Sequence, residues 1–110
     1  MENKSKAETY IGFAIRAGKY RTGMNTIKTL KRAFVVLVCK TASENTKKEA
    51  FKAAAKLRSP VLITKNKTLE EMTYRENAKV MAVTDAKLAE AILRESEKDF
   101  LTLDQEKIYG

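Results

Sequence analysis

A cation-rich stretch at residues 16–32 is the part of this sequence whose residue types point most clearly to chemistry. It reads RAGKYRTGMNTIKTLKR and contains six Lys or Arg residues and no Asp or Glu. The wider interval between Glu8 and Glu44 contains seven cations and no acid. One-sided charge of this kind is typical of a surface that binds a polyanion, although an ordinary solvated surface can have the same composition. Charge alone leaves both interpretations open.

Side chains that catalyse reactions or bind metals are scarce. The chain has no histidine and a single cysteine, Cys39, inside the apolar run FVVLVCK, where we expect a buried thiol. A cysteine nucleophile usually needs a histidine partner, and one cysteine without histidine does not make a zinc site. Glu44 and Asp85 stand at predicted helix starts, where capping explains them. The sequence therefore predicts a binding protein rather than an enzyme, with no metal and no cofactor.

Length and composition indicate one soluble domain. The chain has 110 residues, a hydrophobic fraction of 44% and a net charge of +8. Residues 1–67 carry 16 Lys and Arg against 4 Asp and Glu, or +12, whereas residues 68–110 carry 6 against 10, or −4. No apolar run approaches the roughly 18 residues of a membrane span, and the N-terminus lacks the apolar core of a signal peptide. We therefore expect a cytoplasmic location.

Helical and strand-like segments alternate along the chain. Spacings of three and four between apolar residues predict helices at 5–17, 23–33, 44–58, 69–74 and from about 85 through Ile92. Apolar runs predict strands at 33–40, 59–64 and 79–84, and the short segment KYRT at 19–22 is interpreted as an edge strand. This alternation predicts an α/β protein, a three-layer α/β/α sandwich with a mixed, mostly parallel sheet of about four strands. Residues 1–97 would form the domain, and residues 98–110 a short acidic extension.

The second predicted helix divides the cation-rich stretch into two faces. Met24, Ile27 and Leu30 should face the sheet. The opposite stripe carries an amide, a hydroxyl and two cations, from Asn25, Lys28, Thr29 and Arg32. A helix that opens at Gly23 would present free backbone N–H groups to an anion, and Lys19 and Arg21 lead into that opening. Such a face could bind phosphates and also form paired hydrogen bonds with a base edge.

Three segments in register also carry a family resemblance. IGFAIRAGKYRTG at 11–23, ASENTKK at 42–48 and VMAVTD at 80–85 resemble the bacterial YlxQ and YbxF proteins. These are relatives of the archaeal kink-turn-binding ribosomal protein L-seven-Ae. The resemblance implies an α/β/α sandwich that binds kink-turn RNA, in which a three-nucleotide bulge beside sheared G·A pairs bends the helix. Structured RNA, such as ribosomal RNA, or the ribosome itself would then be the partner, with no membrane and no DNA expected.

In that family, a G-x-N-E-x-x-K-like segment opening the second helix reads guanine edges. Direct counting from Gly23 aligns Asn25, Thr26 and Thr29 with the family's asparagine, glutamate and lysine. One deleted residue instead gives Asn25 the acidic or amide position and Lys28 the lysine position. We prefer this second register because more of the helix matches. The asparagine–glutamate pair is intact in neither register.

The family's second contact comes from the loop after the short fourth helix, which corresponds to residues 75–80 here. The predicted RNA-binding residues are Lys19, Arg21, Gly23, Met24, Asn25, Thr26, Lys28, Thr29, Arg32, Arg75, Lys79 and Val80. The resulting hypothesis is a ribosomal or ribosome-associated RNA-binding protein. Two alternatives stay open: a protein-interaction module on the same fold, and a small enzyme acting on a phosphorylated substrate.

Overall fold

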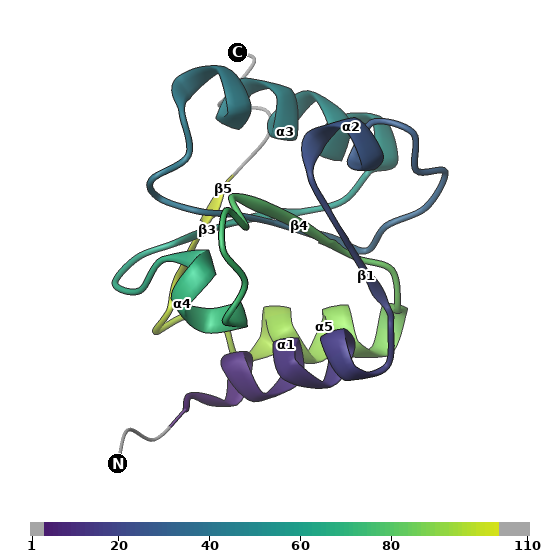
Figure 1. Cartoon of the computed structure of the whole chain (residues 1–110). Coiled ribbons are helices and arrows are strands. Elements are labelled where there is room, and N and C mark those ends of the chain that lie inside the picture. Colours follow the sequence, from purple (N-terminus) through teal and green to yellow (C-terminus); the bar gives the residue numbers. More distant parts are fainter. Residues whose placement is uncertain (1–3, 104–110) are drawn as a thin grey trace.

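The computed structural model describes residues 4–103, in which helices and strands alternate (Figure 1). Their order and bounds are α1 Lys6–Arg16, β1 Tyr20–Thr22, α2 Met24–Ile27, β2 Val35–Val38, α3 Glu44–Leu57, β3 Val61–Thr64, α4 Leu69–Thr73, β4 Val80–Val83, α5 Ala86–Arg94 and β5 Phe100–Leu103. Polar residues cap two of the helix starts: Ser43 Oγ accepts the N–H of Thr46, and Thr68 and Glu71 form a capping box. The predicted α/β class is confirmed.

The sheet differs from the prediction in strand direction and strand number. Its order is β1-β4-β2-β3-β5, and β2–β3 is the one parallel pair in the part of the chain described. The predicted mostly parallel sheet of about four strands is therefore wrong. Its basis was the alternation of helical and strand-like segments, which is present, and β2 and β4 are buried at every position, as their apolar runs indicate. A strand that is buried on both faces is covered by helices on both sides of the sheet. Such burial does not show whether the strand runs parallel or antiparallel to its neighbours.

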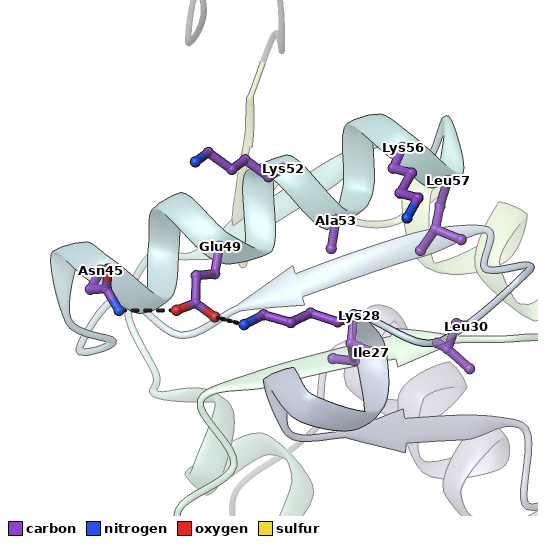
Figure 2. A pocket seen from close by; sticks show the side chains of 9 residues that line it. All are labelled: Ile27, Lys28, Leu30, Asn45, Glu49, Lys52, Ala53, Lys56 and Leu57. Carbon is purple, nitrogen blue, oxygen red and sulfur yellow. Dashed lines mark hydrogen bonds and ion pairs between the residues drawn. The ribbon is translucent and has the colours of Figure 1, made fainter.

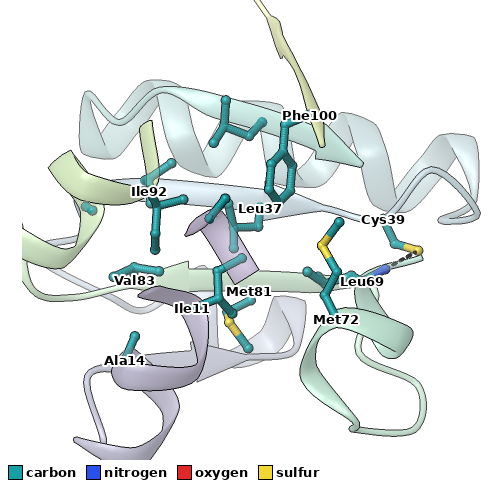
Figure 3. Close-up of a cluster of buried hydrophobic side chains, with 14 residues drawn as sticks. Ile11, Ala14, Leu37, Cys39, Leu69, Met72, Met81, Val83, Ile92 and Phe100 are labelled. Carbon is teal, nitrogen blue, oxygen red and sulfur yellow. Dashed lines mark hydrogen bonds between the residues drawn. The ribbon is translucent and has the colours of Figure 1, made fainter. Parts of the chain in front are cut away.

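Two hydrophobic clusters on opposite faces of the sheet produce three layers. Side chains alternate along β2, so that Val35 and Leu37 lie in the cluster with α1, α4 and α5, whereas Val36 and Val38 lie in the cluster with α2 and α3. Figure 3 shows the first of these clusters, with Leu37 among its members. The helices therefore cover the sheet on both sides, as Figure 1 shows.

The fifth strand extends the sheet beyond the expected domain. Phe100–Leu103, which we expected within an extension outside the domain, form β5 and pair antiparallel with β3. Phe100 is 2% exposed and belongs to the core cluster with α1 and α5. The folded unit therefore reaches at least Leu103. The rest of the predicted acidic extension, residues 104–110, lies outside the described residues.

The second helix is much shorter than predicted. The spacing predicts helix over 23–33, but α2 is a single turn from Met24 to Ile27. The Thr29 hydroxyl donates to the carbonyl of Thr26 at 2.8 Å, which gives the backbone a local alternative to helix. The chain then runs irregularly to β2, where the Phe34 N–H already bonds the carbonyl of Val83. Joining the sheet at this point requires the helix to end early.

Candidate nucleic-acid interface

The pairing of β1 with β4 brings the two predicted contact segments together. Thr22 lies opposite Met81, so Gly23 follows β1 at the end of the sheet where the 75–80 loop enters β4. The Arg75 guanidinium lies over the ring of Tyr20, 5.0 Å from its centroid. Segments far apart in the sequence therefore share one surface of the molecule. We call this surface, formed by residues 19–26 and 75–79, the β1–β4 surface.

Two cations, Lys19 just before β1 and Arg21 within it, are exposed and lie on a hydrogen-bonded backbone. The Lys19 N–H bonds the carbonyl of Ala14 at 2.8 Å, and its carbonyl accepts the N–H of Thr84 at 3.0 Å. The side chains of Lys19 and Arg21 are solvent-exposed. Arg21 Nη1 donates to the neighbouring carbonyl of Tyr20 at 2.6 Å, which leaves other guanidinium N–H groups for a ligand. These two positive charges are therefore available to an anion.

Gly23 has a conformation that suits glycine. Its φ of 86° and ψ of 133° lie in a region that L-residues rarely adopt. No atom lies within 4 Å of the position where a Cβ would stand, so the backbone is open to solvent there. However, a four-residue helix sums few peptide dipoles. The anion site predicted at the start of a long second helix therefore loses its physical basis, and the exposed cations remain.

The predicted stripe of Asn25, Lys28, Thr29 and Arg32 is not one helical face. Helix α2 ends at Ile27, and Arg32 lies in the irregular segment before β2. Asn25 and Thr26 are exposed beside Gly23. Their polar groups therefore lie on the β1–β4 surface, whereas Thr29 and Arg32 lie beyond the helix.

One of the predicted contacts is half-buried and another is fully buried in the protein. Met24 is half-buried and packs against the cluster beneath α2 and α3. Val80 is 2% exposed within β4. Its predicted role in binding is therefore wrong for the side chain, because the strand holds it in the core.

Lys28 forms an ion pair that the sequence did not indicate. Its Nζ lies 2.7 Å from Glu49 Oε2 on α3, and Asn45 Nδ2 donates to Oε1 of the same carboxylate at 3.0 Å (Figure 2). The hydrogen bond from Lys28 holds the pKa of Glu49 below its usual value. A ligand phosphate would have to compete with Glu49 for Lys28. The ion pair spans a groove of about 510 Å³ between α2 and α3, which Lys56 also lines.

The 75–80 loop is organised by Glu70 of α4. The carboxylate accepts from Lys79 Nζ at 2.7 Å and from the backbone N–H of Asn77 at 3.0 Å. The hydrogen bond with Lys79 lowers the pKa of Glu70 and raises the pKa of Lys79. Lys79 also donates to the Thr41 hydroxyl at 2.9 Å. The hydrogen bonds of Lys79 therefore stabilise the 75–80 loop, and Arg75 is the exposed cation of that loop.

Two cations at the same end of the sheet escaped the sequence analysis. Lys40 follows β2 and Lys65 follows β3. Because these two strands are parallel, both lysines lie at the carboxyl ends of the strands, on the same end of the sheet. Lys40 Nζ donates to the carbonyl of Asn66 at 3.0 Å, and Lys65 Nζ donates to that of Glu97 at 2.8 Å. A lysine within two residues of the end of each of these two apolar strands was the signal that could have identified them.

The Cys39 thiol is buried, as predicted. Its Sγ lies 3.1 Å from the Thr41 hydroxyl and accepts the N–H of Leu69 at 3.3 Å. Burial raises the pKa of this thiol, but the hydrogen bonds with Thr41 and Leu69 outweigh that effect and hold it below the ordinary value. The thiol therefore helps to join β2 to the start of α4.

Residues 4–103 offer few features of other kinds of site. No group of three or more His, Cys, Asp or Glu side chains is placed there to hold a metal ion. No helix of the same residues is long and apolar enough to cross a membrane. Among the residues described, the exposed cations of the β1–β4 surface are therefore the main candidate for a functional site.

Comparison with known proteins supports the fold. A solved structure of a protein of unknown function from Bacillus halodurans is similar to this chain with a TM-score of 0.76 and 20% sequence identity. The similarity covers 86% of this chain and 99% of that one. No protein-family model matches the sequence, and no curated protein matches it significantly. The class is thus an α/β sandwich shared with a protein of unknown function, and the kink-turn-binding family stays a prediction.

Proposed function

We propose that this protein binds structured RNA, and that it favours kink-turn or similarly bent RNA over a straight duplex. The observation that supports this most is the pairing of β1 with β4. It joins Lys19 and Arg21, which lie in a stretch without acids, to Arg75 on the 75–80 loop. A cytoplasmic, ribosomal or ribosome-associated role with no bond-making step belongs to the same proposal.

The mechanism follows from the shape of RNA. The major groove of an A-form helix is too narrow for side chains, and a sharp bend opens it and draws phosphates together. Lys19, Arg21 and Arg75 would contact those phosphates, which provides affinity without sequence preference. The exposed amide of Asn25 beside the open backbone of Gly23 would contact a base edge. Preferential binding to bent RNA would shift the RNA population toward the bent form.

The experiment compares a kink-turn RNA with a straight duplex of equal length at several salt concentrations. We expect tighter binding of the kink-turn RNA and a steep fall of log K with log salt, because counterions are released from the contacted phosphates. Arg75→Ala should weaken binding and reduce the salt slope by about one. Equal affinity for the two RNAs would leave only a generic basic surface.

The control variant is Lys87→Ala. Lys87 is exposed on α5, which packs on the opposite face of the sheet from α2 and α3. Lys56 looks suitable from the sequence because it lies on another helix. It lines the same groove as Lys28, however, and is therefore a poor control. Equal losses for Arg75→Ala and Lys87→Ala would show that the β1–β4 surface is not the binding face.

The groove between α2 and α3 favours one alternative, a protein-interaction module. Leu30 and Leu57 are half-buried there, and Lys52 and Lys56 stand at its rim (Figure 2). Apolar floors with charged rims are typical of surfaces that bind protein segments. A partner that co-purifies after nuclease treatment, and is lost with Leu30→Asp, would support this alternative.

A further inference from the structure

Tyr74 is an aromatic side chain whose exposure has no explanation in the packing of the fold. It is 77% exposed, compared with 42% for Phe13 and 52% for Leu101. It ends α4 and immediately precedes Arg75 of the β1–β4 surface. Single exposed apolar residues are common and need no function, so exposure alone decides nothing. The backbone and the charges around Tyr74 add two independent observations.

The backbone at Tyr74 is left-handed. Its φ of 56° and ψ of 32° are those of a helix C-cap at which glycine is the usual residue. A side chain at this position strains the backbone, and glycine would avoid that strain. A large aromatic ring therefore stands where the fold by itself would favour no side chain. Strained residues of this kind often cluster at functional sites.

The ring has one cation over it and three acids close by. Lys4 Nζ lies 4.8 Å from the centroid of the Tyr74 ring, and the next residue, Arg75, reaches Tyr20 on β1. Glu70, one of the acids close to Tyr74, is already engaged by Lys79. Glu71, also close by, accepts from the N–H of its helix cap. Glu71 and Glu76 are nearby exposed acids whose charges oppose a phosphate.

We propose that Tyr74 is a stacking platform for an unpaired base of the bound RNA, with Lys4 and Arg75 beside the phosphates that flank that base. This inference rests on the proposed RNA binding and names a contact within it. Unpaired bases are recognised by stacking on aromatic side chains, and base–aromatic stacking tolerates any base because each has a π-face. An exposed ring with one cation over it and Arg75 next in the chain offers both parts of such a contact.

The first test compares two RNAs that differ in unpaired bases: a kink-turn RNA with its bulge, and the same RNA with the bulge deleted. Tyr74→Ala should weaken binding of the bulged RNA on the order of tenfold or more and change binding of the bulge-deleted RNA little. Tyr74→Phe should bind as the wild type does, because it keeps the ring. Folding is not at risk in these variants because the side chain is exposed.

Phe13→Ala is the matched control. Phe13 is also an exposed aromatic beside a cation, Arg16 at 5.0 Å, but it lies on α1 and not on the loop after α4. Phe13→Ala should leave both affinities unchanged. Equal losses for Tyr74→Ala and Phe13→Ala, or no loss for Tyr74→Ala, would overturn the stacking proposal while the wild type still discriminates between kinked and straight RNA. A wild type that binds neither RNA would instead overturn the proposed function itself.

A fluorescence measurement tests the contact directly. The chain has no tryptophan, so Tyr74→Trp introduces the single indole of the molecule. Stacking of a base on that ring should quench its emission when bulged RNA is added, and the bulge-deleted RNA should not quench it at equal occupancy. Equal quenching by both RNAs, or by neither while both bind, would contradict stacking at residue 74.

Discussion

Glu8 is a charged residue whose carboxylate is buried in the fold. It is 4% exposed on α1, and its Oε1 lies 3.1 Å from Lys67 Nζ on the segment before α4. A buried carboxylate loses its hydration and needs partners that replace water. The ion pair therefore connects the first helix to a segment about half the chain away.

Lys67→Met should destabilise the protein because it leaves the buried Glu8 carboxylate without this cation. We expect a loss of about 1–3 kcal/mol in the free energy of unfolding. Urea denaturation measures it, with Lys87→Met on the exposed face of α5 as the control. The loss should largely disappear when Glu8→Gln is made in the same chain, since the unpaired charge is then absent. Equal stability of the two lysine variants would contradict this role.

At the scale of elements, the connection between α4 and β4 depends on one carboxylate. Glu70 joins Lys79 at the start of β4 to the backbone N–H of Asn77. The loop also contains two left-handed residues, Tyr74 and Asn77. A loop with such a backbone needs these hydrogen bonds to adopt one conformation. The same bonds remove Lys79 from the cations that a ligand can reach freely.

Glu70→Gln should destabilise the protein in a pH-dependent way. The pKa of Glu70 is lowered in the folded protein from its ordinary value of 4.5. A depressed carboxyl pKa contributes stability above the ordinary value and loses it as the pH falls through the folded pKa. The stability difference between wild type and variant should therefore be full at neutral pH and shrink as the pH falls below 4.5. Thermal unfolding across that range measures it, and a difference independent of pH would contradict the charge-based explanation.

At the scale of the whole molecule, β5 is the outer strand at one edge of the sheet, and it contributes a side chain to the hydrophobic core. Phe100 packs in the cluster that contains Leu37 of β2 and Ile92 of α5 (Figure 3). Its neighbour Leu101 points to the other face of the sheet and is 52% exposed. One strand thus contains a core residue and a surface residue of similar hydrophobicity side by side.

Phe100→Ala should be strongly destabilising, and Leu101→Ala should not. Removing a buried phenylalanine costs about 3–5 kcal/mol through lost burial and the cavity left behind. An exposed position away from special features usually changes stability by about 0.5 kcal/mol or less. Guanidinium denaturation of the two variants compares them within a single strand. Similar losses would mean that β5 is not integrated into the core as described.

The sequence by itself determined the local features of this protein. The caps at Ser43 and Thr68 and the burial of Cys39 were predictable because they depend on residues close in the chain. The burial of β2 and β4 on both faces was also predictable, because each strand is a continuous apolar run. The charge asymmetry is also a property of sequence alone, and it includes the six cations of residues 16–32.

The tertiary structure decided which of these residues meet. Strand direction, the early end of α2 and the inclusion of Phe100–Leu103 in the sheet depend on partners far away in the chain. The ion pairs of Lys28 with Glu49 and of Lys79 with Glu70 also depend on distant partners. They distinguish cations that are already paired with a carboxylate from those that are not, such as Arg75. Local patterns specify what a segment prefers, whereas long-range packing selects its neighbours, and the charges that remain accessible follow from that selection.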